Sequence, residues 1–131
     1  MEKKEIFFLI VDDSETIRVL IEKFLTLNGF THFIKAKDGQ DALDHINAND
    51  GRIDIIICDL NMSPKNGIDL LKKIKRSDNP NIKDAKFLIM TCESEMEQAK
   101  EAIELGAIDY LMKPLSKESF SKKIMNTISK L

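Results

Sequence analysis

Five side chains, at four places in the sequence, have the chemistry to handle a phosphoryl group and a divalent cation. They are Asp12, Asp13, Asp59, Thr91 and Lys113. Each of the four places directly follows a short apolar run. Carboxylates offer hard oxygen ligands and can act as nucleophiles, a hydroxyl can donate a hydrogen bond, and an ammonium can neutralise an anion. Together these types predict a site for a tetrahedral dianion beside a carboxylate.

Three carboxylates in one small site would repel one another if all were ionised. A divalent cation relieves this repulsion, and Mg²⁺ is the preferred candidate because it takes oxygen ligands and retains water. Lys113 adds a positive charge opposite Asp59. We interpret Asp59 as a nucleophile, with the metal and Lys113 neutralising charge on a transferring phosphoryl group. Thr91 would donate a hydrogen bond to one phosphoryl oxygen.

These residues meet only if the apolar runs are strands of one sheet. Three of the runs are continuous and not alternating, which is typical of parallel strands covered on both faces. In open parallel sheets, ligands bind beyond the carboxyl ends of the strands, where the candidate residues stand. The predicted strands are Ile6–Val11, His32–Ala36, Asp54–Cys58, Lys86–Met90 and Ile108–Met112.

Segments with a 3.6-residue apolar period alternate with the runs and predict five helices. The first has Ser14 as its N-cap and ends before Gly29. Ser77–Asp84 is predicted to be a loop with a turn at Asn79–Asn81. The alternation predicts the α/β class, an open five-stranded parallel sheet with five helices on its two faces, in a single domain over residues 1–131. The other four helices are predicted at Asp38–Asn49, Gly67–Arg76, Ser94–Leu105 and Ser116–Lys130.

Composition excludes several classes of function. The chain has 131 residues, 43% of them hydrophobic, and its 22 acidic and 20 basic residues give a net charge of −2. This balance does not favour binding to nucleic acid or anionic lipid. The longest apolar run, Ile6–Val11, is too short for a membrane-spanning helix or a signal-peptide core. Two cysteines, Cys58 and Cys92, have no metal-ligand spacing and cannot form a disulfide framework. We expect a cytoplasmic protein.

Four segments in order resemble the receiver domain of two-component response regulators, most closely the stand-alone chemotaxis type. The resemblance covers essentially the whole chain, and four motifs, each at a strand end, form a strong signal although each alone is weak. It implies the flavodoxin-like strand order 2-1-3-4-5, and we expect a single receiver domain with no output domain in this chain. The segments are Val11-Asp12-Asp13-Ser14, Cys58-Asp59-Leu60-Asn61-Met62, Met90-Thr91 and Gly106 to Pro114.

The resemblance assigns roles to the acidic residues. Asp59 is implied to be the phosphoacceptor, which takes a phosphoryl group from a partner histidine kinase or phosphotransfer protein. Asp12 and Asp13, with Asp59 and the backbone carbonyl of Asn61, are implied to hold Mg²⁺. The protein would then be a signalling phosphoacceptor and not an enzyme, with only self-phosphorylation and self-dephosphorylation activity.

The resemblance also implies a switch. Thr91 and Lys113 would hold the phosphoryl oxygens, and Tyr110 would turn inward when Thr91 moves toward them. The Lys113-Pro114 peptide bond is where the family has a cis peptide. A downstream target protein would bind the face formed by the fourth helix, fifth strand and fifth helix. We expect a monomer or weak dimer that acts by protein contact.

Three features depart from the family pattern. The loop Ser63-Pro64-Lys65 has its proline displaced by one residue and a lysine where an apolar residue is usual. Cys92 replaces a smaller residue and is expected to narrow access to the phosphoryl group. Asn61 and Glu93 stand where the family tunes phosphoryl lifetime, and their types predict a fairly labile phospho-state.

Alternative interpretations remain for the site and for the function. Asp12-Asp13 can serve as a helix N-cap and first-turn acid, and Lys113 as a surface lysine. Thr91 and Tyr110 are common residue types in strands. A degenerate receiver, acting as a phosphorylation-independent interaction module, is the main competing function. A flavodoxin-like carrier would need a phosphate-binding loop without carboxylates, and an aspartyl phosphatase would need an acid at Asn61.

Overall fold

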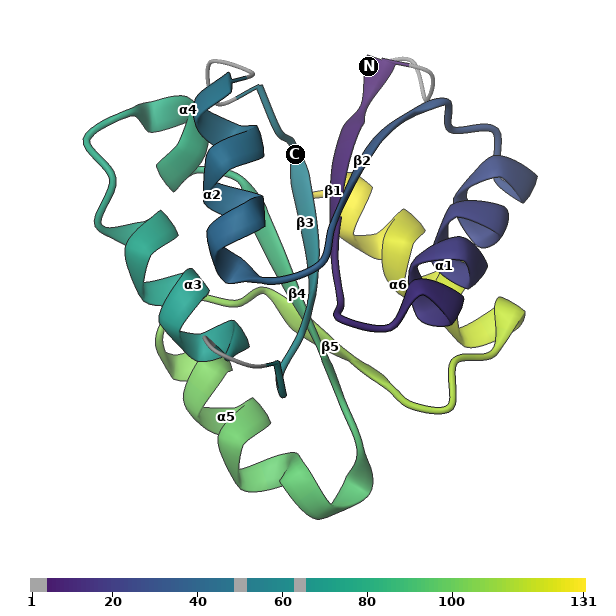
Figure 1. Cartoon of the computed structure of the whole chain (residues 1–131). Coiled ribbons are helices and arrows are strands. Elements are labelled where there is room, and N and C mark those ends of the chain that lie inside the picture. The colour runs from purple at the N-terminus through teal and green to yellow at the C-terminus, as the bar shows by residue number, and fades with distance from the viewer. Residues whose placement is uncertain (1–4, 49–51, 63–65) are drawn as a thin grey trace.

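A computed structural model describes residues 5–48, 52–62 and 66–131. Its five strands form one parallel sheet in the order β2-β1-β3-β4-β5, and Figure 1 shows helices on both faces of it. The predicted α/β class and the strand order are confirmed. The strands are β1 (Phe7–Val11), β2 (His32–Ala36), β3 (Ile55–Asp59), β4 (Lys86–Thr91) and β5 (Asp109–Met112).

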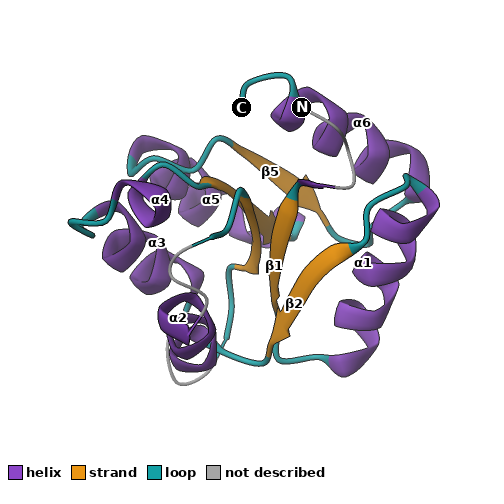
Figure 2. Ribbon diagram, turned by 90° about the horizontal axis from the view of Figure 1, so that it is seen from above, coloured by secondary structure: helices purple, strands orange, loops and turns teal. Residues whose placement is uncertain are grey.

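The helices pack on the two faces of the sheet. Helices α1 and α6 cover one face, and α2, α3, α4 and α5 cover the other (Figure 1). Seen from above, β2 and β5 are the two edges of the sheet (Figure 2). The helices are α1 (Glu15–Leu27), α2 (Gly39–Ala48), α3 (Gly67–Lys75), α4 (Pro80–Lys83), α5 (Met96–Glu104) and α6 (Lys117–Ile128), and a 3₁₀ helix, η2, spans Glu93–Glu95.

The prediction of five helices is wrong by one within the described ranges. The segment expected to be a loop with a turn contains α4, a single helical turn. The Asn79 side chain caps α4 by accepting the N–H of Asn81, and Pro80 occupies the first turn, where its missing N–H costs nothing. The predicted fourth and fifth helices are therefore labelled α5 and α6. No helix in the described ranges is long and apolar enough to cross a membrane.

Strand burial explains why the candidate site lies at the ends of the strands and not along them. Every residue of β3 is buried, and β1 and β4 are buried along nearly their whole length. One apolar cluster fills each side of the sheet, so polar groups have room only beyond the strand ends. Two boundaries shift outward from the prediction: Asp59 and Thr91 are the last residues of β3 and β4 and not the first residues after them.

Candidate functional site

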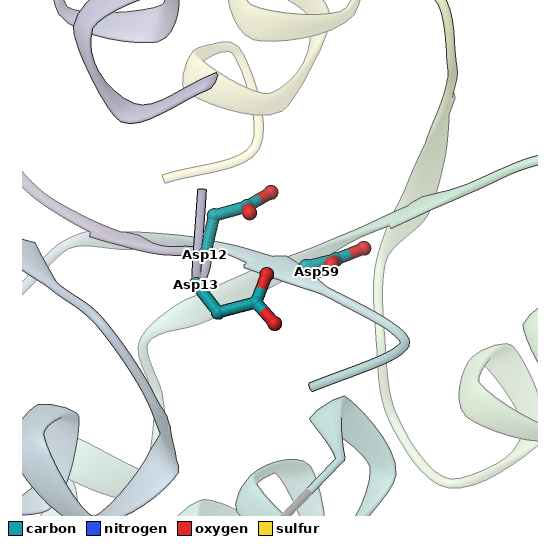
Figure 3. A group of neighbouring side chains, drawn as sticks. All are labelled: Asp12, Asp13 and Asp59. Atoms are coloured by element: carbon teal, nitrogen blue, oxygen red, sulfur yellow. The ribbon is translucent and has the colours of Figure 1, made fainter. Parts of the chain in front are cut away.

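Three carboxylates meet at the carboxyl end of the sheet. Asp12 and Asp13 follow β1, Asp59 ends the neighbouring β3, and the register pairs Val11 with Cys58. One oxygen from each acid lies within 4.8 Å of the other two, and Figure 3 shows the three side chains projecting to the same side. Asp12 is fully buried and Asp59 is 6% exposed, whereas Asp13 is exposed. The sheet therefore brings together the acids that the sequence singled out.

The backbone around Asp12 is held by the start of α1. The N–H of Ser14 donates to Asp12 Oδ1 at 2.8 Å, and Arg18 Nη1 donates to the Asp12 carbonyl at 2.6 Å. Ser14 itself is the N-cap of α1 and accepts the N–H of Ile17. Capping therefore belongs to Ser14, and the carboxylate of Asp12 keeps a second oxygen directed at the site.

Lys113 bridges two of the acids. Its Nζ lies 3.0 Å from Asp59 Oδ1 and 3.3 Å from Asp12 Oδ2. The backbone N–H of Lys113 donates to the Thr91 carbonyl at 2.7 Å, and the Lys113-Pro114 peptide bond is cis. Burial lowers the pKa of Lys113, but the two carboxylates outweigh it and raise the pKa above its ordinary value. The ammonium of Lys113 is thus kept charged inside the site, and this position does not fit the alternative interpretation of Lys113 as a surface lysine.

The pKa of Asp59 is raised above its ordinary value. Burial is the largest cause, and the charges of Asp12 and Asp13 add to it, while Lys113 opposes both through its hydrogen bond and its charge. The hydrogen bond and charge of Lys113 therefore do not offset burial and the two like charges together. A site with an uncompensated negative charge and only oxygen ligands suits a hard divalent cation. Among the described residues, Asp12, Asp13 and Asp59 are the group of carboxylates placed to hold one.

The Thr91 hydroxyl is hydrogen-bonded to the loop that follows β4. It donates to the carbonyl of Cys92 at 3.2 Å, and Thr91 is fully buried. The loop after it is braced by the Cys92 N–H, which donates to Glu95 Oε1 at 3.2 Å, and by a 3.2 Å contact between Cys92 Sγ and Ser94 Oγ. A phosphoryl group on Asp59 would have to compete with the Cys92 carbonyl for this hydroxyl donor.

The remaining candidates differ in their burial. Tyr110 sits on edge strand β5, paired with Ile89 in register, and packs partly buried against the apolar cluster. Asn61 and Glu93 are exposed, as expected for side chains beside a solvent path. The displaced-proline loop, Ser63-Pro64-Lys65, lies outside the described residues.

Cys58 lies in an environment that makes its thiol unreactive. It is fully buried, and its Sγ donates to the Asp59 carbonyl at 3.3 Å. Burial raises the pKa of Cys58, and the charges of Asp59 and Asp12 raise it further. A thiol that stays protonated is neither a nucleophile nor a metal ligand.

Two residues that touch the site were missed in the sequence. Arg18, described above, lies one helical turn after the N-cap, a position that sequence reasoning treats as surface. Gly67 begins α3 so close to β3 that a Cβ there would stand 2.5 Å from the Asp59 carbonyl oxygen and 2.8 Å from Ile89 Cδ1. A glycine at a helix start gives a signal for turn chemistry, but close approach to another strand depends on the tertiary structure.

Comparison with known proteins gives one family. The family model described as response regulator receiver domain matches residues 8–125. Chemotaxis protein CheY of Pseudomonas aeruginosa is 34% identical over 116 residues, which cover 88% of this chain and 90% of that protein. Chemotaxis protein CheY-3 of Vibrio cholerae is 33% identical over 128 residues, which cover 98% of this chain and 95% of that protein.

Solved structures give the same result for the fold. A response regulator from Chloroflexus aurantiacus superposes with a TM-score of 0.86 at 28% identity, covering 96% of this chain and 99% of that one. The chemotaxis response regulator CheY4 of Vibrio cholerae superposes with a TM-score of 0.81 at 30% identity, covering 93% and 98% of the two chains. Both matches cover more than nine-tenths of this chain.

Proposed function

The chain belongs to the response regulator receiver domain family, and on that premise we propose that Asp59 accepts a phosphoryl group from a partner histidine kinase or phosphotransfer protein. The observation that carries the proposal is the geometry around this carboxylate. Asp59 is nearly buried, Lys113 Nζ lies 3.0 Å from its Oδ1, and two further acids stand within 4.8 Å. A structural acid has no need of such neighbours, since like charges raise its pKa and cost stability.

The transfer makes one bond and breaks one. An Asp59 carboxylate oxygen attacks the phosphorus of the partner's phosphohistidine, an O–P bond forms, and the N–P bond breaks with the electron pair leaving on the imidazole nitrogen. The product is an acyl phosphate on Asp59 and a neutral histidine once the ring takes a proton. Lys113 holds positive charge beside the oxygens throughout. Hydrolysis by water later returns the carboxylate and inorganic phosphate.

We assign Mg²⁺ to the carboxylates of Asp12, Asp13 and Asp59, with the backbone carbonyl of Asn61 as a further ligand. Support comes from the oxygen-only donor set and from the raised pKa of Asp59. When bound, the ion supplies charge neutralisation to the phosphoryl oxygens. The raised pKa also means that, without a cation, the nucleophilic carboxylate of Asp59 takes up a proton at a higher pH than an ordinary aspartate does.

A downstream protein would recognise the phosphorylated form by a structural change on one face of the domain. The Thr91 hydroxyl leaves the Cys92 carbonyl for a phosphoryl oxygen, and Tyr110 turns into the space that Thr91 vacates. The face changed by this movement is formed by α5, β5 and α6, where we place the contact with a downstream target protein. Apolar side chains exposed there support a protein contact: Ile103, Leu105, Met112 and Met125.

The proposal extends to the lifetime of the phosphorylated state, the oligomeric state and the location in the cell. Asn61 and Glu93, exposed beside the site, are proposed to tune the attack of water and to give a fairly labile phospho-state. We treat residues 1–131 as one receiver domain that works as a monomer or weak dimer. A cytoplasmic location is proposed from the two cysteines, which form no disulfide framework and suit a reducing compartment.

Intact mass spectrometry tests the proposal directly. The protein is incubated with acetyl phosphate and Mg²⁺, beside an Asp59→Asn variant and a sample with EDTA. We expect a gain of one phosphoryl group in the wild type and no gain in either control. A folded wild-type protein that gains no mass from acetyl phosphate or from a phosphorylated kinase partner would favour the degenerate interaction module instead.

A further inference from the structure

A lysine of the last helix lies over the ring of the proposed switch residue. Lys123 Nζ stands 4.4 Å from the centroid of the Tyr110 ring, within the range of a cation–π contact. Such a contact is favourable only while the ring presents its face to the ammonium. It therefore favours one orientation of Tyr110 over others, namely the orientation that accompanies a Thr91 hydroxyl bonded to Cys92.

A carboxylate holds this ammonium in place. Lys123 Nζ lies 2.9 Å from Asp109 Oδ1, and both side chains are about three-tenths exposed or less. The same Asp109 oxygen accepts the backbone N–H of Tyr110 at 2.8 Å. Asp109 thus fixes the lysine relative to the very residue whose ring the lysine covers. Partial burial of the pair reduces the screening that weakens fully exposed ion pairs.

The contact crosses the edge of the sheet. Helix α6 buries its own Phe120 and Ile124 in the apolar cluster on one face of the sheet, whereas Tyr110 packs against the cluster on the opposite face. In Figure 2, β5 lies at the edge of the sheet, with α5 to one side and α6 to the other. Lys123 reaches over that edge strand, so a side chain of α6 touches the ring that would rotate on the α5 side.

We propose that Lys123 is a positioning residue that, held by Asp109, stabilises the resting orientation of Tyr110 and so opposes activation. The inference rests on the proposed function, because it requires Tyr110 to move when Asp59 is modified. Rotation of the ring away from the ammonium forfeits the cation–π contact. By linkage, any group on Asp59 that needs the rotated ring binds less tightly than it would without Lys123.

The chain provides its own probe of this contact. Tyr110 is the one tyrosine among the 131 residues, and there is no tryptophan, so intrinsic fluorescence excited at the phenol reports the environment of this ring. The probe ligand is beryllofluoride with Mg²⁺, a non-hydrolysing phosphoryl mimic, whose binding is followed independently by ¹⁹F NMR. The full chain is used throughout.

The decisive comparison is Lys123→Met against Lys122→Met. Both variants remove one positive charge from α6 and keep an unbranched side chain, but Lys122 is an exposed neighbour. We expect Lys123→Met to bind beryllofluoride about two- to fivefold more tightly, the factor that an exposed cation–π contact provides. Without the mimic, its fluorescence should move part of the way toward that of the mimic-bound wild type. Lys122→Met should match the wild type in both measurements.

Two further variants make the result independent of folding damage. Lys123→Arg keeps a cation that pairs with carboxylates and stacks on aromatic rings, and it should restore wild-type behaviour. Asp109→Asn loosens the lysine without touching the ring and should shift beryllofluoride affinity in the same direction as Lys123→Met, by less. Equal affinity and equal fluorescence in Lys123→Met and Lys122→Met would overturn the inference.

Failure of the inference can be separated from failure of the proposed function. If wild-type protein takes up no phosphoryl group and no beryllofluoride at Asp59, the proposed function fails. If it takes up both and the Tyr110 fluorescence does not change, Asp59 remains a phosphoacceptor and the role of Lys123 is overturned. A change in wild-type fluorescence that Lys123→Met partly reproduces without the mimic supports both.

Discussion

The two ends of the same sheet use carboxylates in opposite ways. At the amino end, Asp54 Oδ2 accepts the N–H of Phe7 at 2.8 Å, and the backbone of Asp54 exchanges further bonds with Phe7 and Lys86. At the carboxyl end, Asp12 and Asp59 face each other and share one lysine. One acid joins strands to one another, and the others are brought together against their mutual repulsion.

The difference teaches how a working acid can be told from a structural one. The hydrogen bond at Asp54 is local to the strands that it joins, and its contribution is of the order of 1 kcal/mol. At the other end, burial and the like charges of Asp12 and Asp13 raise the pKa of Asp59, and keeping its carboxylate ionised there costs stability. A cluster of acids that costs stability at one end of an otherwise apolar sheet indicates a functional site.

The largest expected effect tests how closely the carboxyl end is packed. In Gly67→Ala, the new Cβ would stand 2.5 Å from the Asp59 carbonyl oxygen, so α3 or β3 must shift. We expect the free energy of unfolding to fall by about 3 kcal/mol, the upper range for overpacking. Urea denaturation in EDTA measures this loss.

Gly29→Ala is the matched control at the amino end. Gly29 leads into β2 with a φ of +92°, and nothing lies within 4 Å of its added Cβ. Its substitution carries only the backbone cost of a left-handed residue, about 1 kcal/mol. Equal losses in the two variants would mean that the carboxyl end is no more tightly packed than the amino end.

Magnesium should stabilise the protein through one end only. A cation bound by Asp12, Asp13 and Asp59 adds about 2.7 kcal/mol to the free energy of unfolding when it is present at 100 times its dissociation constant. Thermal melts with Mg²⁺ and with EDTA measure the difference. Asp13→Asn should lose most of this stabilisation, whereas Asp54→Asn should retain it, since the Asp54 carboxylate is already bonded to the Phe7 N–H. Retention of the full stabilisation in Asp13→Asn would contradict the assignment.

The pH dependence of stability should distinguish the two kinds of acid. Burial and the neighbouring carboxylates raise the folded-state pKa of Asp59 above its unfolded value. Between those two pKa values the folded protein binds more protons, so stability falls as pH rises through the window. In EDTA at pH 7, Asp59→Asn should therefore be more stable than the wild type by an amount of the order of 1 kcal/mol, the scale of a like-charge contact.

The advantage of Asp59→Asn should shrink as pH falls through the window between the two pKa values, and it should be gone below the ordinary aspartate pKa, where the wild-type carboxyl is protonated in both states. Asp54→Asn serves as the control and should gain no stability at pH 7, because its acid accepts a backbone hydrogen bond. An Asp59→Asn variant less stable than the wild type in EDTA at pH 7 would show that Lys113 more than compensates the carboxylates.

Much of the fold and of the acidic site could be predicted, because both follow from strand geometry. Continuous apolar runs indicate parallel strands. Parallel strands bring Asp12, Asp59 and Lys113 to the carboxyl end of the sheet, whatever their separation in sequence. The α4 turn was missed because a capped four-residue helix has no apolar period to detect. Contacts that depend on helix placement, such as Gly67 against Asp59, carry no local signal at all.

The switch region divides in the same way. That Thr91 lies at the carboxyl end of a strand follows from the sequence pattern, but the partner of its hydroxyl, the Cys92 carbonyl, depends on loop conformation. Lys123 reaches Tyr110 only because α6 packs so that one long side chain passes over an edge strand. A lysine on a polar helix face looks the same in sequence whether it makes that contact or not.

The smallest expected effect concerns entry to the acidic end. Cys92 is half-buried in the loop after β4, with Sγ 3.2 Å from Ser94 Oγ. If its bulk narrows the approach to Asp59, Cys92→Ala should accept phosphate from acetyl phosphate faster, by about two- to fivefold, which corresponds to less than 1 kcal/mol of activation free energy. The initial rate of mass gain measures this. Ser94→Ala breaks the same contact and leaves the thiol in place, so it should react at the wild-type rate. Equal rates in Cys92→Ala and the wild type would remove the idea, whereas a faster Ser94→Ala would assign the effect to loop rigidity and not to the size of the thiol.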